Sequence, residues 1–281
     1  MIARTFTLLA MLLSLALPAM AQNLGWRGVA PEDLVLISTA HGTTALELNA
    51  DFAPRHAERI RAMIRAGDLD GVFFYRVIDG FVAQLGPNGN ASQEWPPLKN
   101  ENERALDLLP FTPFGNGDLY APSVGHDKFG FAMAQSEALG KEWLLHCPGT
   151  VAMARGNNPD SATTEFYIVL DAQRYLDRNL TVFGRVLDGM QFVQKVERGD
   201  PKVASGVMQA PRTGDEVISV RLAADLPAAT RPSYQVQRPG RGLFEGEKRS
   251  ARVRTSPFFY NKPAEVIDIC DFEVKSQQVN R

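Results

Sequence analysis

The sequence predicts a mainly β fold, a closed antiparallel barrel with two helices, on three observations. Most patterned segments alternate apolar and polar residues, or are short apolar runs between turn residues, as strands are. Only two segments have the spacing of an amphipathic helix, one early in the chain and one late. A closed barrel suits this order of elements, because closure of an antiparallel sheet leaves no exposed edge.

The first predicted elements of secondary structure are a hairpin and a helix. Two alternating segments, 34–39 and 44–48, flank a turn at His41-Gly42. The next segment, DFAPRHAERIRAMIRAGDLDG, has apolar residues at helical spacing. Pro54 suits its first turn and Gly67 is placed to end it. We therefore expect the early helix between these two residues.

A strand follows at 71–86, with the sequence GVFFYRVIDGFVAQLG. Most of it is as apolar as a buried strand should be, yet Arg76 and Gln84 interrupt it. A permanently charged side chain is unusual in a buried strand, so its presence calls for a structural or functional explanation. The later predicted elements are strands at 151–154, 166–170, 182–186 and 215–224, and a helix that starts near Asp188.

Two stretches have little pattern. Residues 86–140 are rich in Gly, Pro and Asn, and a structureless loop of this length in a compact domain is often functional. After Asp225 the composition shifts to Pro and Arg, which is typical of a linker. Pattern returns at AEVIDICDFEV, where we expect a strand that carries Cys270.

The first 21 residues, MIARTFTLLAMLLSLALPAMA, have the features of a secretory signal peptide. Arg4 precedes an apolar run, and Ala-Met-Ala forms a small-residue cleavage site before Gln22. A membrane anchor is the alternative, but the run from Phe6 to Leu17 is short for a span. We expect a periplasmic or secreted protein without a membrane span once the signal is removed.

Charge and cysteine content reduce the number of possible function classes further. The net charge of −2 gives no basic surface for nucleic acid. Two cysteines, Cys147 and Cys270, are too few for a disulfide scaffold, and the four histidines have no ligand spacing for zinc. In an exported chain an even count makes a bridge plausible, and free thiols remain the alternative. We expect no metal and no cofactor, and a monomer.

Three blocks of the sequence resemble the cyclophilin family of peptidyl-prolyl cis-trans isomerases. FFYRVIDGFVAQLG is similar to the family signature F-H-R-V-I-x-G-F-x-x-Q-G-G. PGTVAMAR with SATTEFYIVL, and YLDRNLTVFGRVLDGMQFVQKVE, resemble the second and third blocks. The resemblance spans Asp33 to Ala224 and implies an eight-stranded closed antiparallel barrel with two capping helices. The chain then divides into a signal peptide (1–21), a cyclophilin-like domain (32–226) with a long insertion (86–140), and a C-terminal linker and extension (227–281).

The resemblance gives Arg76 a chemical reason. Rotation about an X-Pro bond meets a barrier of roughly 18–20 kcal/mol from amide resonance, although the cis and trans forms differ little in energy. At the twisted transition state the prolyl nitrogen regains its lone pair. A fixed donor that favours this twisted form catalyses rotation without a nucleophile, base or metal. Arginine is suitable because its charge cannot be lost and its fork is planar.

By this resemblance, Arg76 matches the catalytic arginine, Phe81 the aromatic floor of the proline pocket, and Gln84 the glutamine that orders the arginine and the substrate backbone. Residues 153–155 match the strand that pairs with the substrate, and others match pocket walls. The substrate-binding positions implied are Val82, Met153, Ala154, Arg155, Glu165, Tyr167, Tyr175, Leu176 and Leu180.

The chain departs from the family at several of these positions. Glu165 replaces a glutamine, and its carboxylate could pair with Arg76 or Arg155. Leu180 replaces a histidine, which leaves a more apolar pocket, and Tyr175 replaces the tryptophan associated with strong cyclosporin binding. Further changes are Tyr75 before the arginine and Leu85 after the glutamine.

The sequence supports two functions. The first is an isomerase that acts on proline-containing, unfolded or flexible exported polypeptides. The alternative is a cyclophilin-fold binding or assembly module with weak or no turnover, which the altered neighbours of Arg76 and the long insertion favour. We also expect a Cys147–Cys270 disulfide that ties the tail to the barrel.

Overall fold

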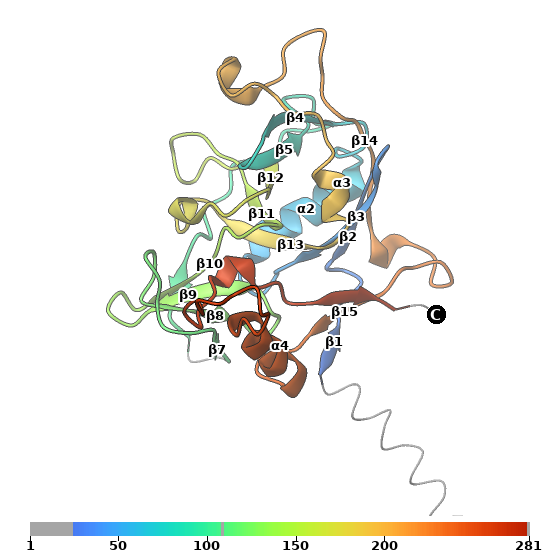
Figure 1. Ribbon diagram of the computed structural model, residues 1–281. Coiled ribbons are helices and arrows are strands. Elements are labelled where there is room, and N and C mark those ends of the chain that lie inside the picture. Colours follow the sequence, from blue (N-terminus) through green and yellow to red (C-terminus); the bar gives the residue numbers. More distant parts are fainter. Residues whose placement is uncertain (1–24, 108–109, 280–281) are drawn as a thin grey trace, which may run out of the picture.

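Eight strands form the antiparallel barrel in the computed structural model, which describes residues 25–107 and 110–279 (Figure 1). The predicted signal peptide lies outside the described residues. Every neighbouring pair of barrel strands is antiparallel. In spatial order the strands are β14 (Val217–Leu222), β2 (Leu34–Thr39), β3 (Gly42–Leu48), β13 (Val182–Asp188), β11 (Thr150–Met153), β12 (Phe166–Val169), β5 (Val82–Gly86) and β4 (Phe73–Ile78).

The two end strands, β14 and β4, meet and nearly close the barrel. Phe73 and Glu216 form a bridge, and the Phe74 amide donates to the Asp215 carbonyl at 2.9 Å. The Val217 amide donates to the Val72 carbonyl at 2.7 Å. These bonds satisfy backbone groups that an open edge would expose. The predicted barrel and its hairpin are therefore confirmed.

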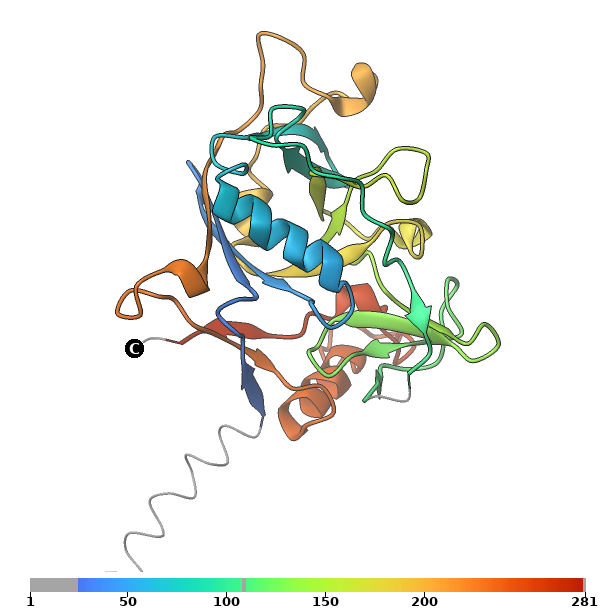
Figure 2. The same ribbon diagram turned by 180° about the vertical axis from the view of Figure 1, so that it is seen from behind.

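The early helix, α2 (Pro54–Ala66), lies across the barrel, as Figure 2 shows. Its limits are those predicted: Pro54 lies in the first turn, and Gly67 ends it with a φ of 79°. Ile60 and Met63 are buried in the main core with residues from all eight barrel strands. The late helix, α3 (Met190–Val193), is a single turn and is shorter than expected.

The insertion and the residues after it, to Leu144, form a five-stranded antiparallel sheet, where no elements were predicted. Its order is β6 (Arg104–Ala105), β10 (Lys141–Leu144), β9 (Ala132–Ser136), β8 (Ser123–His126) and β7 (Thr112–Pro113). Phe131, Met133 and Leu144 from this sheet share an apolar cluster with Tyr167 and Val182 of the barrel. The inner face of the insertion thus packs on the outer face of the barrel.

The tail is folded too, and it contains a strand within the stretch whose composition is typical of a linker. Strand β15 (Tyr234–Gln237) pairs with β1 (Trp26–Gly28) near the start of the chain and with β16 (Ser276–Gln278). Helix α4 (Gly242–Arg252) buries Phe244 against the rings of His126 and Phe272. Burial lowers the pKa of His126 to about 3, so its imidazole is neutral in this packing.

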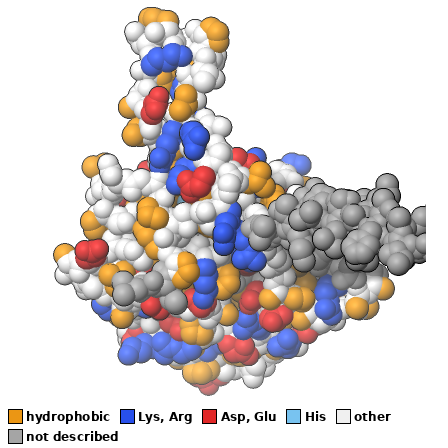
Figure 3. Space-filling model, turned by 90° about the horizontal axis from the view of Figure 1, so that it is seen from below, with side chains coloured by type: hydrophobic (Ala, Val, Ile, Leu, Met, Phe, Trp, Pro, Cys, Tyr) orange, Lys and Arg blue, Asp and Glu red, His pale blue; other side chains and the backbone are white. Residues whose placement is uncertain are grey.

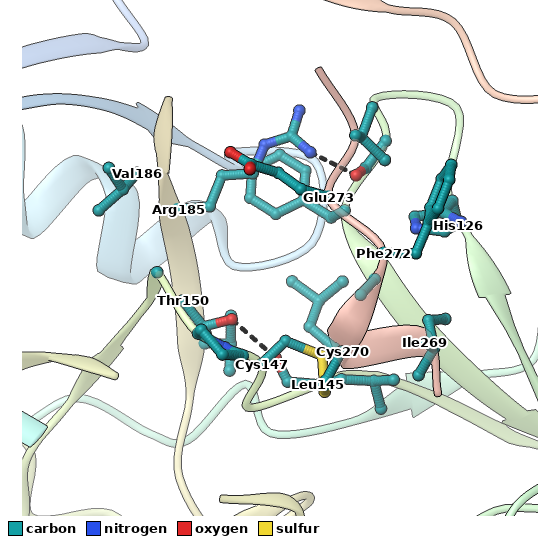
Figure 4. Close-up of a pocket in the computed structure, with 18 of the residues that line it drawn as sticks. His126, Leu145, Cys147, Thr150, Arg185, Val186, Ile269, Cys270, Phe272 and Glu273 are labelled. Carbon is teal, nitrogen blue, oxygen red and sulfur yellow. Dashed lines mark hydrogen bonds between the residues drawn. A yellow bond between two sulfur atoms is a disulfide. The ribbon is translucent and has the colours of Figure 1, made fainter. Parts of the chain in front are cut away.

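Cys270 joins Cys147 in a disulfide between the tail and the barrel. The expected strand around Cys270 is wrong, because residues 269–271 form a one-turn 3-10 helix, η4 (Ile269–Asp271). The Asp268 carboxylate accepts from the Cys270 amide at 2.8 Å and so caps this turn. Beside the disulfide lies a cavity of about 330 Å³, which Thr150, Arg185 and Glu273 help to line (Figure 4).

The surface agrees with the charge balance of the sequence. Seen from below, acidic, basic and hydrophobic side chains are interspersed over the face shown in Figure 3. Of the described helices, none is both long enough and apolar enough to span a bilayer.

Candidate active site

The outer face of strands β4 and β5 brings together the three predicted catalytic residues. Arg76 on β4 lies opposite Gln84 on β5 in the strand register. Its Nη1 donates to the Gln84 side-chain oxygen at 3.3 Å, and its Nε donates to the Ser205 carbonyl at 2.9 Å. The guanidinium carbon lies 5.6 Å from the centre of the Phe81 ring. These contacts hold a half-buried cation in one place beside an aromatic surface.

Tyr75 fixes the orientation of Gln84. The Gln84 amide nitrogen donates to the Tyr75 hydroxyl at 2.6 Å, so its oxygen faces Arg76. Burial raises the pKa of Tyr75 far above its ordinary value, so the phenol stays neutral. Tyr75, which departs from the family signature, therefore orients Gln84, which matches it.

An apolar cluster adjoins the arginine through Phe81. Val82 and Tyr167 are buried, while Phe81, Ala154 and Leu180 are half-buried in the same cluster. Leu176 is half-buried and Tyr175 is 61% exposed; both belong to the one-turn helix η1 (Arg174–Leu176). A fixed cation next to an apolar surface is the arrangement that a proline ring and its amide require.

Comparison with known proteins decides the family. The family described as "Cyclophilin type peptidyl-prolyl cis-trans isomerase/CLD" matches residues 34–221. The chain belongs to the cyclophilin family. It is 33% identical over 197 residues to a probable peptidyl-prolyl cis-trans isomerase of Brucella suis, covering 69% of this chain and 85% of that one. It is 29% identical to peptidyl-prolyl cis-trans isomerase cyp18 of Streptomyces antibioticus, over 58% of this chain and 82% of that one.

A solved cyclophilin extends the likeness beyond the barrel. The structure of cyclophilin AquaCyp293 from Hirschia baltica superimposes with a TM-score of 0.75 at 26% identity. The match covers 92% of this chain and 95% of that one, so it includes much of the insertion and tail. This chain is therefore a cyclophilin-type peptidyl-prolyl isomerase with large additions to the barrel.

The strand predicted to pair with substrate contributes unevenly in this cyclophilin. The Met153 side chain lies inside the barrel core, and its amide already donates to the Thr181 carbonyl at 3.0 Å. The Ala154 amide already donates to the Glu165 carbonyl at 2.8 Å. The Arg155 guanidinium folds back onto the carbonyls of Asn179, at 2.8 Å, and Gly156, at 2.7 Å.

Glu165 does not pair with either arginine. One carboxylate oxygen accepts from the Asn88 amide at 2.8 Å and from the Thr164 hydroxyl at 3.2 Å, and the other is buried. The Tyr75 hydroxyl also interacts with this carboxylate. Burial raises the pKa of Glu165. The carboxylate lies against Gly86, where a Cβ would come within 2.3 Å of it. Only glycine at position 86 leaves room for this rotamer.

His146 is a neighbour of the pocket that sequence reasoning missed. Its Nε2 lies 3.1 Å from the Tyr167 hydroxyl, and its Nδ1 lies 3.1 Å from the Asp177 carboxylate. The tautomer that donates from Nδ1 accepts the Tyr167 proton at Nε2. The sequence offered no signal for this contact, because the two rings are 21 residues apart and only folding joins them.

In the part of the chain that the structure describes, no three His, Cys, Asp or Glu side chains cluster as metal ligands do. The chemistry of the site is that of hydrogen-bond donors and apolar walls.

Proposed function

We propose that this cyclophilin is an exported isomerase that rotates X-Pro bonds in unfolded or flexible exported proteins, with Arg76 as its catalytic donor. The fixed guanidinium beside the apolar surface carries the catalytic part of the proposal. Two of its nitrogens have protein acceptors, and Nη2 has none among the described residues. That nitrogen is available to the substrate.

The proposed mechanism is stabilisation of the twisted amide. The proline ring packs beside Phe81, Val82 and Tyr167, where burial of its apolar surface anchors it. As the bond twists, the prolyl nitrogen becomes pyramidal and its lone pair becomes available. Arg76 donates to the amide more strongly in this state than in the planar one, and Gln84 holds the donor in position. Interactions of this kind lower the barrier because they favour the transition state over the ground state.

A lysine at position 76 tests whether the planar fork matters. Arg76→Lys keeps the charge but loses the contacts to both Gln84 and Ser205. We expect kcat/KM in a protease-coupled proline assay to fall at least about tenfold, a loss of about 1.4 kcal/mol. An unchanged kcat/KM would show that a fixed fork is not required. Family membership favours the isomerase over a binding module, and a protein that never exceeds the uncatalysed rate would favour the module.

The proposal of export is supported by the N-terminal sequence and by the disulfide, which suits an oxidising compartment. Expression of the full chain in a Gram-negative host tests it. We expect the protein in the periplasmic fraction with Gln22 as its first residue, by intact mass. Full-length protein confined to the cytoplasm would contradict export. We further propose a monomer, which light scattering of the purified protein checks.

A further inference from the structure

The tip of the insertion, residues 115–121, is anchored beside the proline pocket. Arg174 Nη1 donates to the Asp118 carboxylate at 2.6 Å, and both side chains are largely buried. Arg174 begins the one-turn helix whose next two residues, Tyr175 and Leu176, were assigned to the substrate groove. Figures 1 and 2 both show the green tip next to this yellow turn of the chain.

The anchor is connected to the pocket itself. Arg174 Nε also donates to the Asp177 carboxylate at 2.6 Å. Asp177 holds the ring of His146, which contacts the Tyr167 hydroxyl. A continuous chain of charged and polar groups therefore joins the tip to the pocket wall.

The tip has a defined shape. The Asp118 carboxylate accepts from the amides of Tyr120, at 2.8 Å, and Ala121, at 2.9 Å. Gly117 has no room for a side chain, since a Cβ would lie 2.4 Å from the Pro122 carbonyl oxygen. The side chains that the tip presents are therefore held in place before any ligand arrives, which lowers the entropic cost of binding.

This fixed tip exposes apolar side chains. Leu119 is 99% exposed and Tyr120 is 56% exposed, and Tyr175, which follows Arg174 in η1, is 61% exposed. The Tyr120 ring lies 5.2 Å from the Arg174 guanidinium, whose charge Asp118 and Asp177 neutralise. The surface is thus apolar and aromatic, and the Arg174 cation beneath it is already paired. Such a surface suits an apolar side chain better than a charged one.

We propose that Leu119, Tyr120 and Tyr175 form a subsite for an apolar or aromatic side chain of the substrate polypeptide, on one flank of the proline. The occupant follows from continuity with the groove, because Tyr175 and the pocket residue Leu176 are adjacent. An extended chain advances about 3.3 Å per residue, so residues two to four positions from the proline lie roughly 7–13 Å from it. The inference rests on the proposed function, in that the proline ring occupies the pocket beside Arg76.

Peptides of two lengths test the subsite in the purified protein. One set is short, with the proline near its centre. The other is longer and places Leu, Phe or Ser at each of the second to fourth positions on either flank. We expect wild type to prefer Leu or Phe over Ser about 5- to 10-fold in kcat/KM at one position on one flank, as for a well-placed aromatic contact. The double variant Leu119→Ser, Tyr120→Ser loses this preference and keeps its kcat/KM for short peptides.

Leu139→Ser is the matched control, since Leu139 is 53% exposed in a different turn of the same sheet, between β9 and β10. It keeps the wild-type preference. The subsite is refuted if the double variant keeps the preference, or if Leu139→Ser loses it equally. Wild-type self-association that the double variant abolishes, with a flat peptide profile, would identify the surface as a contact between copies instead. Failure of the proposed function has a different signature, which is short-peptide activity that does not depend on Arg76.

Discussion

The disulfide gives a prediction whose size follows from the fold. Replacing Cys147 and Cys270 together by alanine removes a crosslink between residues 123 positions apart. In the chain-entropy model a loop of this length stabilises the folded state by about 5 kcal/mol. Few contacts are lost otherwise, because each alanine keeps the Cβ. At a urea slope of about 2.5 kcal/mol/M, the midpoint of unfolding falls by roughly 2 M.

The assay is urea unfolding followed by tryptophan fluorescence, at constant pH and protein concentration. Wild type under reducing conditions is the control, and its midpoint should match that of the double alanine variant. Activity on short peptides should persist in both, because Arg76 and Gln84 lie on barrel strands that the crosslink does not touch. A midpoint unchanged by the substitutions, or two thiols titrated in the unfolded, unreduced protein, would refute the reasoning.

Three further predictions concern the site. Burial raises the pKa of Glu165 in the folded protein. Above that pKa the ionised carboxylate therefore lowers the free energy of unfolding, and at low pH, where the carboxyl is protonated in both the folded and the unfolded protein, it does not change it. Glu165→Gln should therefore raise the free energy of unfolding by about 1 kcal/mol at pH 8 and leave it unchanged at pH 3; equal effects at both pH values would contradict this. Tyr75→Phe removes the acceptor for the Gln84 amide and should lower kcat/KM about 5- to 10-fold with little change in stability, whereas full activity would show that Gln84 needs no such partner. Leu180 predicts a preference of about tenfold for apolar residues adjacent to the proline, measured with peptides that vary only there, and a flat profile would argue against it.

Much of the barrel could be predicted because its residues alternate with the period of a strand. In β5, for example, Ala83 and Leu85 point into the core while Val82 and Gln84 point outward. The ends of α2 were predictable for a different reason, since proline and glycine act locally on the backbone.

The insertion and the tail could not be predicted in the same way. Their strands are two to five residues long, too short to establish a period. Strand β15 also owes its stability to β1, whose residues lie more than two hundred positions earlier in the chain. Such long-range pairing forms only when the chain folds, so the local sequence of either strand carries no pattern that predicts it.

The candidate site was predictable as far as its motif extends. Arg76, Phe81 and Gln84 come together as the resemblance implied. The directions of the Glu165 and Arg155 side chains were not foreseen, because their partners, the Asn88 amide and the Asn179 carbonyl, are backbone groups placed by loop geometry.

The central claim is that the fixed guanidinium of Arg76 lowers the barrier to proline rotation. The most direct test is kcat/KM of Arg76→Ala against wild type on one short X-Pro peptide, with equal folding verified by urea unfolding. Loss of a preorganised donor of this kind costs about 10²–10³ in rate. The account predicts a fall of that size, with the variant near the uncatalysed rate. A folded Arg76→Ala protein within about twofold of wild type, a difference of only about 0.4 kcal/mol in barrier height, would contradict it.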